Sequence, residues 1–429
     1  MRWRLRNAGL ATVLGILRVV LRVLSPVVPQ SRSVVVAASP ETEGNGIEVA
    51  RALVRRYDGR VVWLREGGAL PDEVRALAGQ GLVLVPKASL VGLWAYLRAE
   101  TVLFTHGLYG SPRPCARKPI VNLFHGDGPK DVRPGRDVGA LLASTYLVGS
   151  TPLFSHAQAS AFGVPTERVL LTGNPRTDQL WRPPDRDRLR RLGITGEFVV
   201  WMPTFRRARA VGAVRVRPDD ERTEGVDDGR QELEVLLAGL RQRGVQLVVK
   251  PHPMDADRRR WTGAVTVDED DLVRAGVGLY ALLGASSGLV TDYSSVWVDY
   301  LLLDRPLAFL VPDRASYART LHPADVLDWL PGEVVDRSDR PFRAFLADLD
   351  AGGRAGAATR CEVSQRIGLS PSRTAADDLV TALAELGVLG SPGQGSGAGP
   401  TAGAAGRCAG AGTAAPASGS WRGSGRPRR

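Results

Sequence analysis

The chain has 429 residues, more than one hydrophobic core usually organises, so its length favours two domains. A hydrophobic fraction of 44% with 24% charged residues is typical of an ordinary globular protein. The 56 basic residues outnumber the 45 acidic ones, which favours anionic partners. The sequence has no zinc-finger spacing, aromatic RNA-binding signature or basic leucine zipper, so we expect no nucleic acid among those partners.

The first predicted element is an amphipathic helix within residues 1–30. On a helical wheel over residues 4–24, one sector holds arginines separated by small or polar residues: Arg4, Asn7, Ala11, Gly15, Arg18 and Arg22. Apolar side chains face the other way: Leu10, Val13, Leu14, Leu17, Leu21 and Leu24. A cleaved signal peptide would need small residues where Arg18 and Arg22 stand. A domain helix would bury the leucines on the core. We favour a helix on an anionic membrane surface, because the apolar run is too short to span a bilayer.

From Ser33 onward, short β-rich runs alternate with helical patterns. The first series has runs at 34–37, 61–64, 82–85, 102–104, 120–124 and 146–148, with helical spacing at 47–57 and 71–78. A second series begins at Phe198 and includes 247–249, 288–290 and 307–310. Such alternation predicts right-handed crossovers and parallel sheets covered on both faces. We therefore expect an α/β chain of two doubly wound domains, residues 31–185 and 196–388, that face each other across a central cleft.

Polar segments follow four of these runs. They are His125-Gly126-Asp127-Gly128-Pro129-Lys130, Pro203-Thr204-Phe205-Arg206-Arg207, Pro251-His252-Pro253 and Thr291-Asp292-Tyr293-Ser294-Ser295. Ligands of open parallel sheets bind outside the carboxyl ends of the strands, so these segments are expected to share one cleft. A helix start near Ser294 offers free N–H groups to a phosphate, although a plain helix cap is the usual role of serine there.

The rest of the chain predicts a loop, a last helix and a tail. Residues 207–231 carry charges and glycines, which is typical of a loop that closes over substrate or of a solvated insertion. Residues 374–386 have helical spacing, and Gly387 is a plausible stop. Residues 390–429 are rich in Gly, Ala, Ser and Pro with scattered Arg, so we expect a disordered basic tail.

In their order, these motifs resemble the CDP-glycerol glycerophosphotransferase family, the teichoic acid primases and polymerases of bacterial walls. The resemblance spans about residues 100–385. It is carried by His125-Gly126 with Lys130, Gly173-Asn174-Pro175-Arg176-Thr177-Asp178, Pro203-Thr204-Phe205-Arg206, Lys250-Pro251-His252-Pro253, Thr291-Asp292-Tyr293-Ser294-Ser295 with Asp299-Tyr300, and Pro331-Gly332.

The resemblance implies a GT-B-like fold of two Rossmann-like domains, with the acceptor on the N-terminal side and the donor nucleotide on the C-terminal one. It implies transfer of glycerol phosphate, or a related polyol phosphate, from CDP-glycerol or a related CDP-polyol to a hydroxyl of a lipid-linked cell-wall or capsule glycopolymer, with release of CMP. It also implies peripheral attachment to the cytoplasmic face of the membrane. No cofactor is expected. The five histidines form no i, i+4 pair and the three cysteines no C-x-x-C pair, so we expect no metal site and reduced thiols.

Such a reaction needs a base for the hydroxyl and positive groups for the phosphates. We assign His125 as the general base and His252 to the donor pyrophosphate or the leaving group; a structural turn histidine is the alternative for each. The substrate-binding candidates are Gly126, Lys130, Thr204, Arg206, Lys250, Thr291, Asp292, Ser294, Ser295 and Asp299. Asp299 would accept from a glycerol hydroxyl or fix a neighbouring base, and a surface or capping role is equally open for it. His106 and His156 are assigned structural roles.

Some assignments stay open. The family's first motif usually reads His-Gly-Thr-Pro-x-Lys, and Asp127 here would either repel an anionic acceptor or orient His125. Asn174, Arg176 and Asp178 are expected to form a turn held by an Arg–Asp pair. Two other functions fit the same motifs: a GT-B glycosyltransferase or epimerase that uses a UDP-sugar, and a non-catalytic nucleotide-binding membrane adaptor.

Overall fold

The computed structural model describes residues 2–132, 142–204, 229–252, 261–314, 321–336 and 340–390, with side chains from Thr12 onward. Arg206, residues 207–228 of the expected loop, and residues 391–429 of the expected tail lie outside the described residues. Cys115 is free and half-buried.

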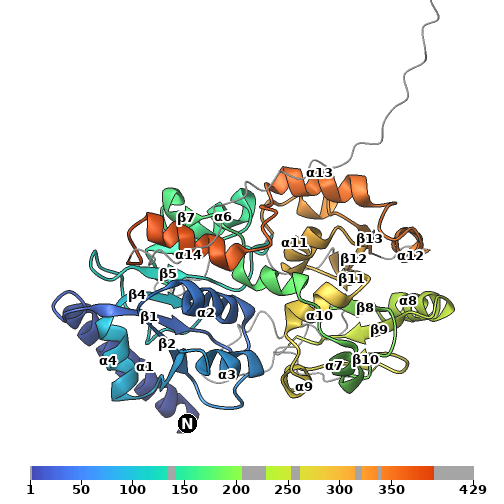
Figure 1. The fold of residues 1–429 in the computed structure, drawn as a ribbon. Helices are drawn as coiled ribbons and strands as arrows, with labels where there is room; N and C mark the ends of the chain where they lie inside the picture. The colour runs from blue at the N-terminus through green and yellow to red at the C-terminus, as the bar shows by residue number, and fades with distance from the viewer. Residues whose placement is uncertain are drawn as a thin grey trace, which may run out of the picture. The chain divides into compact units, whose positions relative to one another are not determined.

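The first sheet contains seven parallel strands (Figure 1). They are β1 (Ser31–Ala37), β2 (Arg60–Arg65), β3 (Val83–Pro86), β4 (Ala99–Phe104), β5 (Ile120–Asn122), β6 (Tyr146–Val148) and β7 (Val169–Leu170). Their order is β3-β2-β1-β4-β5-β6-β7, and each neighbouring pair is parallel. The order changes direction between β1 and β4, and this reversal is the place where doubly wound sheets open a crevice for ligands.

The second sheet repeats this topology with six strands. They are β8 (Phe198–Trp201), β9 (Gln246–Val249), β10 (Val265–Thr266), β11 (Gly288–Thr291), β12 (Leu307–Leu310) and β13 (Glu333–Val335), in the order β10-β9-β8-β11-β12-β13. Every pair is parallel, and the reversal falls between β8 and β11. The predicted fold class, two Rossmann-like parallel-sheet halves, is confirmed. The expectation did not include the short strands β7, β10 and β13.

Helices cover the sheets. They are α1 (Arg2–Leu24), α2 (Gly44–Arg56), α3 (Asp72–Ala78), α4 (Leu90–Arg98), α6 (Pro152–Phe162), α7 (Arg186–Arg191), α8 (Arg230–Gln242), α9 (Glu269–Ala275), α10 (Leu279–Ala285), α11 (Val296–Tyr300), α12 (Arg343–Asp350), α13 (Ala357–Ile367) and α14 (Ala375–Glu385). The 3₁₀ segments η2 (Pro175–Trp181) and η4 (Leu301–Leu303) join some of them.

Strand β1 shows why the sheet is covered on both faces. Val34 and Val36 pack in one apolar cluster with α2 and α14, whereas Val35 packs in another with α1 and α4. All three valines are fully buried. Successive strand side chains point to opposite faces, so a continuous apolar run requires a helix layer on each side.

The last helix, α14, belongs to the core of the first sheet. Leu379 and Leu383 are fully buried in the cluster that contains Val34. On the surface, the Arg55 guanidinium donates to both carboxylate oxygens of Asp377 at 2.9 Å. The sequence analysis assigned this segment to the second domain. It did not anticipate that the chain folds back from the second sheet to pack α14 on the first.

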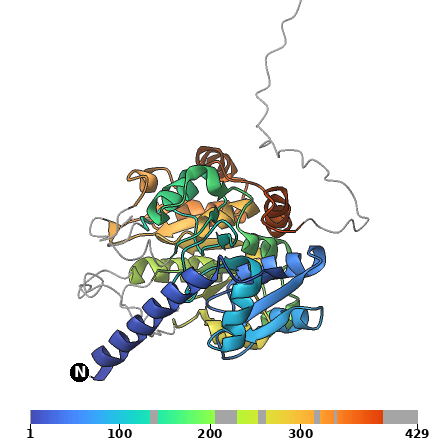
Figure 2. The ribbon, with the colours of Figure 1, turned by 90° about the vertical axis from the view of Figure 1, so that its left-hand side faces the viewer.

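Helix α1 packs on the first sheet through its leucines. Leu21 is buried, and Leu17 and Leu24 pack against the same cluster. The Arg18 guanidinium donates to the carbonyl of Gly110 at 2.6 Å. The leucine face of α1 therefore packs on the core of the first sheet, which was the alternative given in the sequence analysis. Figure 2 shows the start of α1 extending away from the strands. Within the described residues, no helix combines the length and apolarity needed to cross a bilayer.

Candidate active site

Two histidines meet beyond the ends of adjacent strands. Strand β4 pairs with β5, and a His-Gly dipeptide follows each: His106-Gly107 and His125-Gly126. The two imidazole centroids lie 4.5 Å apart, with the ring planes at 66°. Phe124, whose positive φ of 47° is unusual for a residue other than glycine, packs its ring 4.3 Å from that of His125. The turn at Phe124 thus directs the histidine out of the sheet.

The surroundings of His125 favour the neutral imidazole. Dense protein around the residue lowers its pKa well below the ordinary value, and the positive charges of His106, Arg176 and His252 act in the same direction. The His125 side chain itself is exposed, so solvent or a substrate can reach it.

Arg176 connects the two halves of the chain beneath His125. It donates from Nε and a terminal nitrogen to Asp299 Oδ2, at 3.0 and 2.7 Å. Its other terminal nitrogen donates to the His125 carbonyl at 2.5 Å. Both Arg176 and Asp299 are buried. The backbone that carries the predicted base is therefore fixed by a buried ion pair.

Asp299 is fully engaged by protein groups. Besides Arg176, it accepts from Asn174 Nδ2 at 3.0 Å and from the Tyr280 hydroxyl at 2.6 Å. Its side chain is 1% exposed. The expected contact with a substrate hydroxyl is therefore not supported by the geometry, and we now propose a positioning role. The Arg–Asp pair expected for this region exists, but Arg176 pairs with Asp299 instead of Asp178.

The histidine loop packs directly on the start of α11. A β-carbon added to Gly126 would lie 2.7 Å from Ser295 Oγ, and one added to Gly128 would lie 2.4 Å from Ser295 Cβ. Only glycine allows so close an approach. The Gln158 side chain holds this loop from the other side by donating to the Gly126 carbonyl. The loop of the first sheet and the Ser294-Ser295 turn of the second are thereby in contact.

Asp292 joins two strand ends at the reversal of the second sheet. Its Oδ2 accepts from both the backbone N–H and the hydroxyl of Thr204 at 2.8 Å, and its Oδ1 accepts from Ser294 N–H at 3.2 Å. Thr291 is buried and donates to the Met202 carbonyl. Thr204, Thr291 and Asp292 therefore hold the turns, while Ser294 and Ser295 remain half-exposed.

Helix α11 is shorter than the sequence pattern suggested. It covers Val296–Tyr300 and continues as the 3₁₀ segment η4. Ser295 occupies the cap position without a side-chain cap bond. Because the macrodipole of so short a helix is small, any anion here would depend mainly on the two serines and nearby N–H groups.

The predicted lysines differ in their placement. Lys250 is buried, and its ammonium forms a 3.3 Å ion pair with Glu269 at the start of α9. Lys130 is half-exposed, and its backbone pairs with that of Leu321 in an isolated antiparallel β-bridge. The adjacent Pro129 carbonyl accepts from His322 N–H at 2.7 Å. The Lys250 ammonium is thus engaged by a protein carboxylate. Lys130 lies where the histidine loop meets the second half of the chain.

Asp127 turns away from His125. Its Oδ2 accepts five hydrogen bonds, from the backbone N–H and hydroxyl groups of Ser150 and Thr151 and from the Ser155 hydroxyl. Burial raises the pKa of this carboxyl. The side chain fixes the loop to the start of α6, so the structure favours neither of the two roles expected from the sequence.

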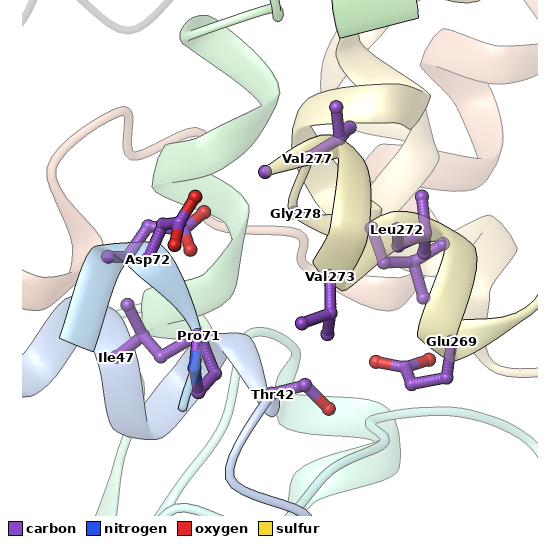
Figure 3. Close-up of a pocket in the computed structure, with 12 residues that line it drawn as sticks. Thr42, Ile47, Pro71, Asp72, Glu269, Leu272, Val273, Val277 and Gly278 are labelled. Carbon is purple, nitrogen blue, oxygen red and sulfur yellow. The ribbon is translucent and has the colours of Figure 1, made fainter. Parts of the chain in front are cut away.

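A groove lies between α2 and α3 on one side and α9 and α10 on the other (Figure 3). Asp72, Glu73 and Glu269 contribute carboxylates to its lining. None of the histidines lines it. The groove is therefore distinct from the strand-end segments to which the sequence analysis assigned phosphate binding.

The sequence analysis did not anticipate that His106 contacts His125 or that Arg176 pairs with Asp299. His106 was assigned a structural role, yet its His-Gly dipeptide follows a strand end just as His125-Gly126 does. That repetition was a usable signal. No comparable signal marked the ion pair, because its members are 123 positions apart.

The fold and the site define an α/β protein of two doubly wound parallel sheets whose strand-end loops meet around histidines and serines. The chain belongs to the CDP-glycerol:poly(glycerophosphate) glycerophosphotransferase family, whose model matches residues 88–363. This confirms the resemblance drawn from the motifs.

Individual relatives match part of the chain. It is 29% identical to the teichoic acid ribitol-phosphate primase of Bacillus spizizenii, over 41% of this chain and 43% of that protein. It is 27% identical to the teichoic acid glycerol-phosphate transferase of Staphylococcus aureus, over 44% of this chain and 48% of that protein. The matches thus span less than half the length of these relatives. The wall teichoic acid polymerase TagF shares the fold, with a TM-score of 0.63 and 18% identity over 90% of this chain and 98% of that chain.

Proposed function

We propose that this chain transfers glycerol phosphate, or a related polyol phosphate, from a CDP-polyol to a hydroxyl of a lipid-linked glycopolymer and releases CMP. Family membership supports the reaction class. Relatives named as glycerol-phosphate and ribitol-phosphate enzymes support a polyol phosphate as the transferred group. One similar structure is that of TagF after a soak with CDPG.

The observation that carries the proposal is the contact between the histidine loop and the Ser294-Ser295 turn. Gly126 and Gly128 bring the loop against Ser295. The charge of His252 acts to lower the pKa of His125. A base, a second imidazole and two hydroxyls therefore gather where the ends of the two sheets meet. Phosphoryl transfer needs such a set, since positioning and charge stabilisation supply most of the catalysis.

In this proposal the neutral His125 accepts the proton of the acceptor hydroxyl as the oxygen attacks the polyol-bearing phosphate. The bond from that phosphorus to the CMP oxygen breaks, and His252 stabilises the charge on the leaving phosphate. Ser294 and Ser295 donate to phosphate oxygens. Arg176 holds the His125 backbone, and Asp299 acts through Arg176. Arg206, expected to bind phosphate, lies outside the described residues and keeps the role proposed from the sequence.

A donor screen tests the reaction. Purified protein is incubated with a lipid-linked acceptor and with CDP-glycerol, CDP-ribitol or a UDP-sugar, and nucleotide release is measured. We expect CMP from at least one CDP-polyol and no UDP. Release of UDP would instead identify a UDP-sugar enzyme, and no release with any donor would identify a non-catalytic binding protein.

Substitution of His125 tests the proposed base. We expect His125→Ala to lower CMP release by about 10²–10⁴-fold, the usual contribution of a general base, while binding of the CDP-polyol is retained. His156→Ala, at a histidine on α6, is the matched control and is expected to keep activity. Full activity of His125→Ala would disprove the assignment.

We also propose that helices α1 and α4 attach the protein to an anionic membrane. Outside the leucine face that packs on the sheet, α1 exposes Val13, Ile16, Val19, Val20 and Val23. On α4, Leu90, Val91 and Trp94 are 84%, 63% and 57% exposed. Both helices pack on the same face of the first sheet. Apolar side chains so exposed on neighbouring helices are typical of a helix pair that inserts among lipid headgroups.

The contacting face differs from the one expected from the sequence, because the leucines are used for packing and Arg18 bonds to Gly110. Deleting residues 1–28 would remove Leu21 from the core, so a substitution is the better test. We expect the double substitution Val20→Ser and Val23→Ser to lower sedimentation with vesicles that contain phosphatidylglycerol. Val235→Ser, at an exposed valine of α8, is the control. Equal sedimentation of both variants would refute attachment through α1.

A further inference from the structure

We propose that His106 and His125 work as a pair, in which His106 takes the first proton and thereby keeps His125 free to accept one from a substrate hydroxyl. The part of this inference that concerns the substrate rests on the proposed function; the pairing itself does not. His106 acts through His125 and is therefore a positioning residue.

The position of His106 in the fold supports the pairing. It follows β4, the strand at which the order of the first sheet reverses, and the crevice of a doubly wound sheet opens at that point. Both histidines are exposed, and the loop that carries His125 contacts Ser295. At a centroid separation of 4.5 Å, two protonated rings repel strongly. One proton on the pair therefore opposes a second.

The hydrogen bond of His106 defines which nitrogen is available. Its Nδ1 lies 3.0 Å from the carbonyl oxygen of Thr105. A carbonyl oxygen only accepts, so Nδ1 must carry a hydrogen. The neutral ring then has its lone pair on Nε2, and that atom takes and releases the proton.

The charged neighbours decide which ring is protonated first. Burial lowers the pKa of His106, although that of His125 is lowered further. The Thr105 carbonyl and Glu66, after β2, favour a proton on His106, and Lys87, after β3, opposes it. Lys87 is itself paired with Glu66 at 2.5 Å. The charges of His106, Arg176 of η2 and His252 after β9 all oppose a proton on His125. The first proton therefore goes to His106, and His125 stays neutral to lower pH than an isolated histidine would.

Ring titration by NMR tests the pairing without any substrate. The chain has five histidines, so the ring signals are few, and the signal of His125 is identified by its loss in His125→Asn. In the wild-type protein we expect His125 to respond to pH in two steps, as coupled groups do. His106→Phe keeps an aromatic edge against His125 but cannot titrate. In this variant we expect one step, displaced upward by about one pH unit.

Two further variants complete the test. His106→Gln can still donate to the Thr105 carbonyl, so it covers a failure of the Phe variant to fold, and it should give the same single step. His156→Phe is the control and should leave the His125 titration unchanged. An identical His125 titration in wild type and both His106 variants would overturn the inference.

The pH dependence of CMP release provides a second readout. A base works only when it is unprotonated, so a higher pKa of His125 must lower the rate on the acidic side. We expect the ratio of the rates at pH 6 and pH 8 to fall several-fold in His106→Phe. An unchanged ratio contradicts the inference. The two proposals can fail separately. If the titration is as expected but no CMP is released from any CDP-polyol, the pairing is supported and the proposed function is refuted.

Discussion

At the scale of single residues, Arg176 connects the two halves of the chain through its side chain. It neutralises the buried Asp299 and holds the His125 carbonyl. Burying two charges is costly, and such a pair persists only when its geometry satisfies both partners. Here the fork of the guanidinium, together with Asn174 and Tyr280, satisfies the carboxylate. The pair therefore specifies the position of the histidine loop more than it stabilises the chain.

We predict that Arg176→Met lowers the free energy of unfolding by about 3–5 kcal/mol, because it leaves the Asp299 carboxylate buried without a counterion. The control is Arg243→Met, since Arg243 makes a similar two-pronged bond to Asp350 at 2.7 Å on the surface. That exposed pair should contribute about 1 kcal/mol or less. Urea unfolding measures both values. Equal losses in the two variants would contradict the prediction.

The double variant Arg176→Met with Asp299→Asn separates stability from positioning. With the carboxylate charge removed, we expect much of the stability lost in the single variant to return. CMP release should stay low, because the His125 carbonyl still lacks its donor. Recovery of both properties together would show that the pair has no positioning role.

The residues of the site were predicted unevenly, and the reason is physical. The positions of His125, His252, Ser294 and Ser295 after strand ends were predicted correctly, because strand ends can be inferred from local apolar runs. Arg176 and Asp299 meet only after folding, so no local pattern marks their bond. Buried acceptors such as Asp292 were expected to touch substrate because sequence reasoning does not reveal that Thr204 satisfies them.

At the scale of elements, the strands with continuous apolar runs were predicted well. The run 146–148 became β6 and the run 307–310 became β12. The strands β7 and β10 have two residues each and lie at sheet edges. Runs so short carry no periodicity, and they are fixed by pairing with a neighbour. Helix α11 was expected to be longer because apolar spacing does not distinguish an α-helix that continues as a 3₁₀ turn.

The start of α6 offers a test at this scale. Asp127 Oδ2 accepts from the backbone N–H groups of Ser150 and Thr151, ahead of the helix. We predict that Asp127→Ala lowers the free energy of unfolding by about 2–4 kcal/mol, because it leaves buried donors without an acceptor. Asp185→Ala is the control, since Asp185 caps the exposed helix α7. That loss should be about 1 kcal/mol. Thermal or urea unfolding measures both losses. Equal losses of unfolding free energy in Asp127→Ala and Asp185→Ala would contradict the prediction that Asp127 satisfies buried donors.

At the scale of the whole chain, a helix near the end of the described residues packs on strands near the beginning. Helix α14 lies near the end of the described residues, yet it completes the core of the first sheet with Leu379 and Leu383. The carboxylate of Asp178, in η2, accepts from the N–H groups of Ala375 and Ala376 at the start of α14, at 2.7 and 3.2 Å. The first sheet therefore cannot complete its core until the chain after the second sheet has folded back.

This arrangement predicts that the core of α14 limits the stability of the first sheet. Leu383→Ala should lower the free energy of unfolding by about 2–5 kcal/mol, the usual loss for a leucine truncated in a core. Leu386→Ala is the matched control, because Leu386 follows the same helix and is 50% exposed. Its loss should stay within about 0.5 kcal/mol. Hydrogen exchange provides the spatial check: in Leu383→Ala the amides of β1 and β2 should exchange faster, while those of β11 and β12 change less. Faster exchange confined to β11 and β12 would show that α14 stabilises the second sheet instead.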